Sequence, residues 1–146
     1  YYGEERNSRK IAKSIVEFRK KRKIDSTKML SDIIQKINKY KFKHPATRVF
    51  QALRIVVNEE LNELEKALKI SLEILTKNGR IVIVAFHSLE DKIIKNFFKK
   101  NGCKNNNGDK KNAFRIITKK PITPSTEEIK INPRSKSAKL RVAEKI

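Results

Sequence analysis

The feature that most constrains the fold is a continuous apolar segment from Arg80 to Phe86, with the sequence RIVIVAF. It is rich in β-branched residues and lacks polar alternation, which is typical of a strand covered on both faces in a parallel sheet. Asn78 and Gly79 directly precede it and suit the end of a helix. We therefore expect a helix, a turn and a buried strand, as in the crossover of an α/β domain.

Apolar residues at helical spacing predict several helices around this strand. The expected helices cover residues 4–22, a segment after Asp25-Ser26, residues 45–75 as two helices bent near Asn58, and residues 89–100. A serine or threonine at the start of the second of these helices can cap its free amides. Two later strands are expected at 113–118 and 138–143, with a short helix at 126–131 between them. Three strands alone would leave a sheet edge and one face poorly covered, so we expect further chain upstream.

The charge is strongly positive and unevenly distributed. The 146 residues carry a formal net charge of +20, and residues 1–44 and 91–146 hold all of the excess around a neutral middle. Lysine and arginine neutralise phosphates, so a nucleic-acid partner is one interpretation. Lysine also greatly outnumbers arginine, as codon drift in an AT-rich genome would produce, so composition alone leaves both interpretations open.

The cysteine content and the hydropathy argue against a disulfide-bonded, a zinc-binding and a membrane-spanning protein. The single cysteine, Cys103, cannot form an intramolecular disulfide, and no histidine lies near it to complete a zinc site. No apolar run approaches the roughly 20 residues of a membrane span. We expect a cytoplasmic protein without a metal site.

Four segments of the chain form a specific pattern: YGEER at 2–6, FKHPATR at 42–48 running into FQALRI at 50–55, GR at 79–80 leading to FHSLED at 86–91, and NPRSKSAKLR at 132–141. Together they resemble a known family, the bacterial methyltransferases of type H that modify the N4 amine of a cytidine in small-subunit (16S) ribosomal RNA. Their order and spacing agree with the family over essentially the whole chain.

The resemblance implies the fold class and the domains. It implies the C-terminal half of a class I Rossmann-like methyltransferase sheet, preceded by part of an α-helical insertion. Residues 1–44 then correspond to the end of the RNA-facing insertion lobe, and residues 45–146 to the C-terminal half of the methyltransferase domain. The last two strands would be the antiparallel pair that closes such sheets.

The resemblance also implies S-adenosylmethionine as the methyl donor, and small-subunit ribosomal RNA or the ribosomal subunit as the partner. The glycine-rich loop expected to hold that cofactor is not in this sequence. Its four glycines, at positions 3, 79, 102 and 108, form no Gly-x-Gly cluster between a strand and a helix. We expect no cofactor-binding residues in this chain.

Candidate catalytic residues follow the apolar strand, because ligands of open α/β sheets bind outside the carboxyl ends of strands. His87 is a candidate for orienting the base or accepting a proton, with a structural hydrogen bond as the alternative. Ser88 is a candidate for substrate contact, with capping of the next helix as the alternative. Glu90 and Asp91 fall in the first turn of that helix and favour its dipole, which argues against a catalytic carboxylate pair.

Candidate RNA-binding residues lie in two places. The first group surrounds the start of the helix after Pro45 and comprises Lys43, His44, Thr47, Arg48 and Gln51. The second follows Pro133 and comprises Arg134, Ser135 and Lys136. Both groups can donate to phosphates or base edges, and both also suit a structural hinge or a solvated turn.

The sequence therefore predicts part of a ribosomal RNA methyltransferase. One alternative is a catalytically inactive, truncated remnant of that enzyme that still binds RNA. Another is a small basic ribosome-associated protein unrelated to methylation, which the four matching segments disfavour.

Overall fold

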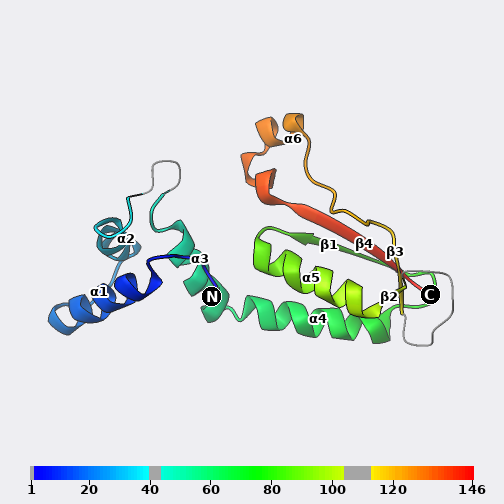
Figure 1. The fold of residues 1–146 in the computed structure, drawn as a ribbon, viewed down its shortest axis with the longest axis horizontal. Coiled ribbons are helices and arrows are strands. Elements are labelled where there is room, and N and C mark those ends of the chain that lie inside the picture. Colours follow the sequence, from blue (N-terminus) through cyan, green and yellow to red (C-terminus); the bar gives the residue numbers. More distant parts are fainter. Residues whose placement is uncertain (1, 40–43, 104–112) are drawn as a thin grey trace. The chain divides into compact units, whose positions relative to one another are not determined.

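The computed structural model describes residues 2–39, 44–103 and 113–146 of the chain. Its elements group into two compact units, Tyr1–Glu60 and Leu61–Ile146 (Figure 1). The helix after Pro45 packs with the helices before it, through Ala46, Val49 and Phe50. The assignment of 1–44 to an insertion lobe remains a prediction.

The described residues of the first unit form the helices α1 (Ser8–Lys21), α2 (Thr27–Gln35) and α3 (Thr47–Val57). Their apolar faces meet around Ile11, Ile34 and Ala46, which are buried. The predicted cap of α2 is confirmed, since the Ser26 hydroxyl accepts a hydrogen bond from Met29 N at 3.2 Å.

Helix α1 begins four residues later than predicted. Glu4 has a positive φ of 50°, and the Glu5 carboxylate accepts a hydrogen bond from Asn7 N at 2.9 Å. Residues 4–7 therefore lie before the helix, and none of these four residues is apolar.

The second unit is mixed α/β. It contains α4 (Glu60–Ile74), which begins at the unit boundary, then β1 (Arg80–Ala85), α5 (Ser88–Asn101), β2 (Gly102–Cys103), β3 (Phe114–Ile116), α6 (Thr126–Ile131), the 3₁₀ helix η1 (Pro133–Ser137) and β4 (Lys139–Lys145). The two helices expected on either side of Asn58 are confirmed as α3 and α4, and α6 has its predicted bounds.

The strands form a four-stranded sheet in the order β1-β4-β3-β2. Strand β4 is antiparallel to both β1 and β3, and the short β2 is parallel to β3. The expected antiparallel pairing of the last two strands is thus confirmed. Asn78 has a φ of 64° and donates to Lys145 O, so the predicted left-handed turn connects α4 to β1 beside the end of β4.

One face of this sheet carries the core of the second unit. Leu68 of α4 and Ile94 and Phe98 of α5 pack against Ala85, Phe114 and Ala143 of the strands. Figure 1 shows α4 and α5 running alongside the strands.

The opposite face of the sheet is exposed, which corrects the expected burial of the 80–86 strand on both faces. Val82 is 58% exposed, Val84 46% and the following Phe86 55%. The reason is that α4 and α5 pack on the same face, and that β1 is the outermost described strand with antiparallel β4 as its neighbour.

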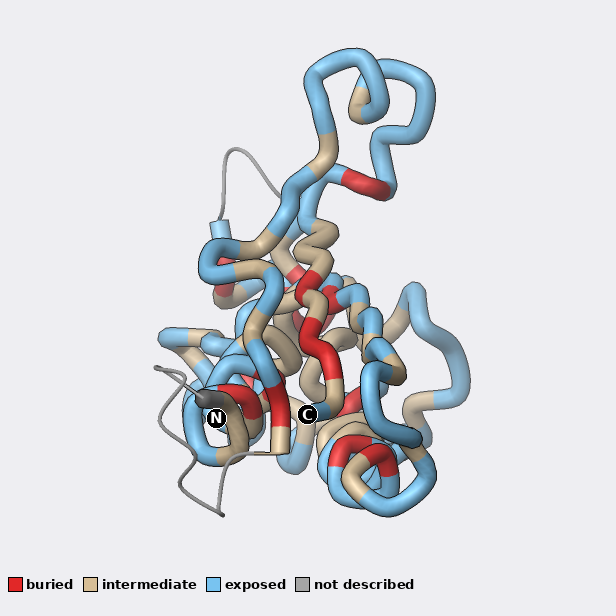
Figure 2. The backbone as a smooth tube through the Cα atoms, turned by 90° about the vertical axis from the view of Figure 1, so that its right-hand side faces the viewer, coloured by how far each residue is buried: buried red, intermediate tan, exposed pale blue. Residues whose placement is uncertain are grey.

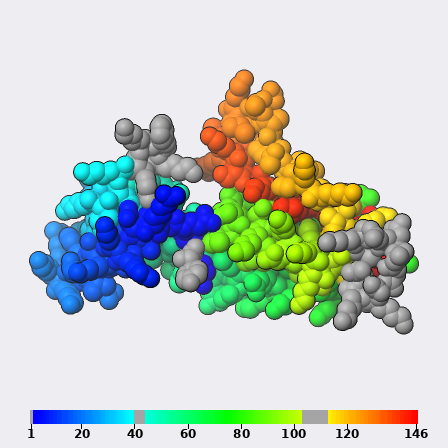
Figure 3. Space-filling model, viewed as in Figure 1, coloured from blue at the N-terminus to red at the C-terminus, as the bar shows by residue number. Residues whose placement is uncertain are grey.

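The segment between β3 and β4 projects from the second unit (Figure 3) and carries α6 and η1. Almost all of it is exposed, and Ser135 is its one buried residue between positions 119 and 137 (Figure 2). Among the described residues, no helix has the length and apolar character needed to span a membrane.

Candidate functional site

The chain leaves β1 at Ala85 and enters α5 through His87, which is the N-cap residue of that helix. His87 Nδ1 accepts a hydrogen bond from Glu90 N at 3.3 Å. The Glu90 carboxylate in turn accepts from Phe86 N at 2.7 Å and from His87 N at 3.1 Å. This reciprocal capping box fixes the backbone at the carboxyl end of β1.

The capping box changes the interpretation of two candidates. The expectation that Ser88 caps the helix is wrong, because Ser88 is already its first residue and His87 provides the cap. For His87 the structural hydrogen bond is present, while Nε2 lies 3.4 Å from Glu90 Oε1. A role for His87 or Ser88 toward a substrate remains a prediction.

Asp91 links the first turn of α5 to the start of β4. Its carboxylate accepts from Arg141 Nε at 2.7 Å and from Lys139 Nζ at 3.2 Å. The hydrogen bond from Arg141 is the main cause that lowers the pKa of Asp91, and burial opposes it. Sequence reasoning placed Asp91 in the first helical turn but could not reveal these partners, which lie about 50 positions away.

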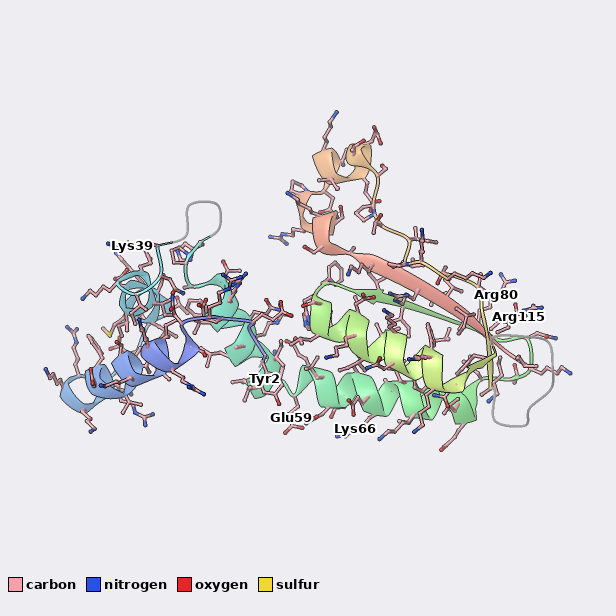
Figure 4. The ribbon with its side chains drawn as sticks, viewed as in Figure 1. Tyr2, Lys39, Glu59, Lys66, Arg80 and Arg115 are labelled. Atoms are coloured by element: carbon pink, nitrogen blue, oxygen red, sulfur yellow. The ribbon has the colours of Figure 1, made fainter. Side chains whose placement is uncertain are left out.

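A second carboxylate binds two arginines on the exposed face of the sheet. Glu144 of β4 pairs with Arg80 of β1 at 3.0 Å and with Arg115 of β3. Figure 4 shows Arg80 and Arg115 at the same end of the sheet. The hydrogen bond from Arg80 is the main cause that lowers the pKa of Glu144. These pairs join three strands and leave the guanidinium groups about two-thirds exposed.

Of the five RNA-binding candidates near the start of α3, the structure describes four and gives two of these structural contacts. His44 Nδ1 accepts from Ala46 N at 3.3 Å, and Arg48 donates to Glu4 O at 3.2 Å. Gly3 must lack a side chain here, because a Cβ would lie 2.3 Å from Arg48 O. Thr47 is exposed and Gln51 half-buried. Lys43 lies outside the described residues.

Asn38 is a polar residue of this region that sequence reasoning missed. It is 1% exposed, accepts a hydrogen bond from Asn7 Nδ2 at 2.8 Å and donates to Pro45 O at 3.3 Å. It therefore ties the segments before α1 and before α3 to the end of α2. No local pattern indicates such a residue, because its partners are 31 and 7 positions away.

The second group of RNA-binding candidates lies on η1. Arg134 and Lys136 are exposed, whereas Ser135 is buried and donates to Asn132 O at 2.8 Å. The two cations remain available for a phosphate, and the serine has a structural role in the turn.

The described glycines have packing or turn roles. Gly102 packs so closely that a Cβ would lie 2.4 Å from Phe98 O. Gly79 belongs to the turn before β1, and Gly3 to the contact with α3. Among residues 2–39, 44–103 and 113–146 these three glycines thus have structural explanations.

Comparison with known proteins decides the family. A sequence model described as the MraW methylase family matches residues 1–146. This chain belongs to the MraW methylase family. Curated relatives named ribosomal RNA small subunit methyltransferase H are 52% identical in Sulfurihydrogenibium sp. (strain YO3AOP1), 51% in Leptospira interrogans (strain Fiocruz L1-130) and 52% in Caldicellulosiruptor bescii.

Each of these alignments covers 99% of this chain, but only 48%, 42% and 50% of the respective relative. The chain thus spans about half the length of the curated relatives it matches. The resemblance stated from four segments is confirmed at the level of the family.

Proposed function

We propose that this chain is the C-terminal part of a methyltransferase that uses S-adenosylmethionine to methylate the N4 amine of a cytidine in small-subunit ribosomal RNA. The observation that carries the proposal is the roughly 50% identity over 99% of the chain to relatives named ribosomal RNA small subunit methyltransferase H. Because the chain spans half of those relatives, the remaining half is proposed to hold the cofactor.

The exposed sheet face supports this division. Val82 and Val84 present apolar surface where a Rossmann-like sheet would carry a second layer of helices. The outermost position of β1 among the described strands also leaves an edge to which further strands can add. The pairing of β1 with an antiparallel final strand fits the closing half of such a sheet.

The cofactor would supply the methyl group, and this chain would contribute the rim of the crevice. Ligands in open α/β sheets bind at the carboxyl ends of strands, where β1 ends at Ala85. The capping box holds Phe86 and His87 in a fixed backbone geometry there. Such positioning can align a cytosine amine with the donor. Exposed Thr47, Arg134 and Lys136 are proposed to contact the RNA backbone.

The test is methyl transfer by the full-length enzyme that carries this chain. Labelled S-adenosylmethionine and small-subunit ribosomal RNA are incubated with the enzyme, and the modified nucleoside is identified by mass spectrometry. We expect N4-methylcytidine at one position. Label on another atom of cytosine would refute the proposed reaction, and RNA binding without methyl transfer would point to an inactive remnant.

A further inference from the structure

A cationic pocket lies between the second half of α5 and strand β3 in the second unit. Its volume is about 180 Å³, and its walls include Lys95, Lys99, Lys119 and Arg141, with Phe98 and Thr118. Its lining contains no carboxylate among the residues that the structure describes. The volume is below the roughly 300 Å³ at which pockets for drug-sized ligands begin, so a small anionic group fits better than a whole cofactor.

The three lysines of this pocket are exposed, and none forms an ion pair within the described part of the chain. Asp91 pairs with Arg141 of the pocket wall and with Lys139, and Glu144 pairs on the other face of the sheet. Asp91 offsets the charge of Arg141, so the positive potential left for an external anion comes from the three lysines.

Arg141 gives the pocket a fixed donor. Its side chain is 9% exposed, and Asp91 holds the guanidinium through Nε at 2.7 Å. A guanidinium carries four further N–H donors in a rigid plane that matches phosphate geometry. Thr118 is fixed beside it, because its hydroxyl accepts from Val142 N at 2.8 Å.

We propose that this pocket binds a backbone phosphate of the RNA substrate. The inference rests on the proposed function for the nature of the substrate, and it adds a contact outside the α3 and η1 candidates. Arg141 provides an ordered hydrogen-bond donor for the phosphate. The three lysines add positive charge, which displaces the counterions condensed on the RNA and so increases affinity.

The test compares two charge-matched triple variants of the chain. Lys95→Gln, Lys99→Gln and Lys119→Gln remove the pocket lysines. Lys92→Gln, Lys100→Gln and Lys120→Gln remove three exposed lysines from neighbouring positions that do not line the pocket. Filter binding to a single-stranded fragment of small-subunit ribosomal RNA is measured over a salt series, and thermal unfolding checks that both variants fold.

We expect the pocket variant to lose about fivefold more affinity than the control at roughly 0.1 M salt, and its salt slope to fall by about 0.7 more. Equal losses in both variants would overturn the proposal in favour of diffuse charge. Inorganic phosphate, followed by ³¹P NMR, provides the second arm. Phosphate binding that the pocket variant abolishes, with RNA affinity unchanged, would also overturn it, because the pocket would then serve free phosphate.

Methyl transfer by the full-length enzyme separates this inference from the proposed function. A pocket-specific loss of RNA affinity without methylation of cytidine would retain the phosphate site and reject the reaction. Methylation of cytidine with equal RNA binding by both variants would retain the reaction and reject the site.

Discussion

Asp91 is the carboxylate through which β4 holds the start of α5, and its lowered pKa makes this link dependent on pH. A carboxyl group whose pKa is lowered by folding stabilises the fold above its unfolded pKa of about 4, and this contribution is lost as the pH falls through the folded value. The link is therefore complete at neutral pH.

We expect Asp91→Asn to lower the free energy of unfolding at pH 7 by about 1 kcal/mol, a modest value because solvent screens the partly exposed Lys139. Thermal unfolding measured from pH 7 to pH 3 checks this, with exposed Glu73→Gln as the control. The gap between wild type and Asp91→Asn should close as the pH falls. A gap of constant size would mean that the charge of Asp91 is not the cause.

His87 can be tested separately as a cap and as a contact for substrate. His87→Ala removes the cap acceptor and should cost about 1 kcal/mol of stability, whereas His87→Asn retains a side chain suited to the N-cap position. In the full-length enzyme we expect both variants to lose methyl transfer at saturating substrate. Full activity of the stable His87→Asn variant would make His87 a capping residue alone.

At the scale of elements, Asn38 joins the three helices of the first unit through both sides of its amide. Asn38→Ala leaves Asn7 and Pro45 O without this partner and should cost about 2 kcal/mol. Hydrogen exchange should accelerate in α1, α2 and α3, with little change in β1 and β4. Asn62→Ala, at an exposed position of α4, is the control. Equal acceleration in both units would show that they unfold together.

Sequence reasoning predicted the elements whose determinants are local. Apolar spacing indicated the helices α2 to α5. The residue types indicated the cap of α2 at Ser26 and the left-handed turn at Asn78. Each of these features depends on neighbours within one or two helical turns. It failed where partners are distant. The exposure of Val82 and Val84 depends on which side α4 and α5 occupy, and nothing within the 80–86 segment encodes that choice.

The candidate site divides in the same way. Its position in the sequence predicted His87 at the end of β1, but not that its side chain accepts a hydrogen bond from the backbone N of Glu90 and caps α5. Ser135 lies between Arg134 and Lys136 in the sequence and was grouped with them. In the folded turn Ser135 is buried and hydrogen-bonded, whereas the two cations are exposed. The pocket beside Lys95 and Arg141 joins residues 46 positions apart, so no motif signals it.

For the whole molecule, the proposed division of labour predicts that this chain alone does not bind S-adenosylmethionine. The described glycines all have packing or turn roles, and none forms the loop that would hold the cofactor. Isothermal titration calorimetry is expected to show no saturable heat with the chain, whereas the full-length enzyme should give a binding isotherm. Micromolar binding to the chain would place the cofactor site in this half.

The exposed face of β1 also determines how the isolated chain behaves in concentrated solution. An outermost strand beside an uncovered apolar surface is a template for pairing with another chain, so aggregation is expected to rise steeply with concentration. Val84→Lys places a charge in that surface and should suppress light scattering, whereas Glu73→Gln on α4, which raises the net charge by the same amount, should not. Scattering reduced equally by both changes would attribute it to net charge. If only Val84→Lys reduces scattering, the same apolar surface that we propose to be covered by the other half of the enzyme also makes this half aggregate alone. The two halves should then be expressed together.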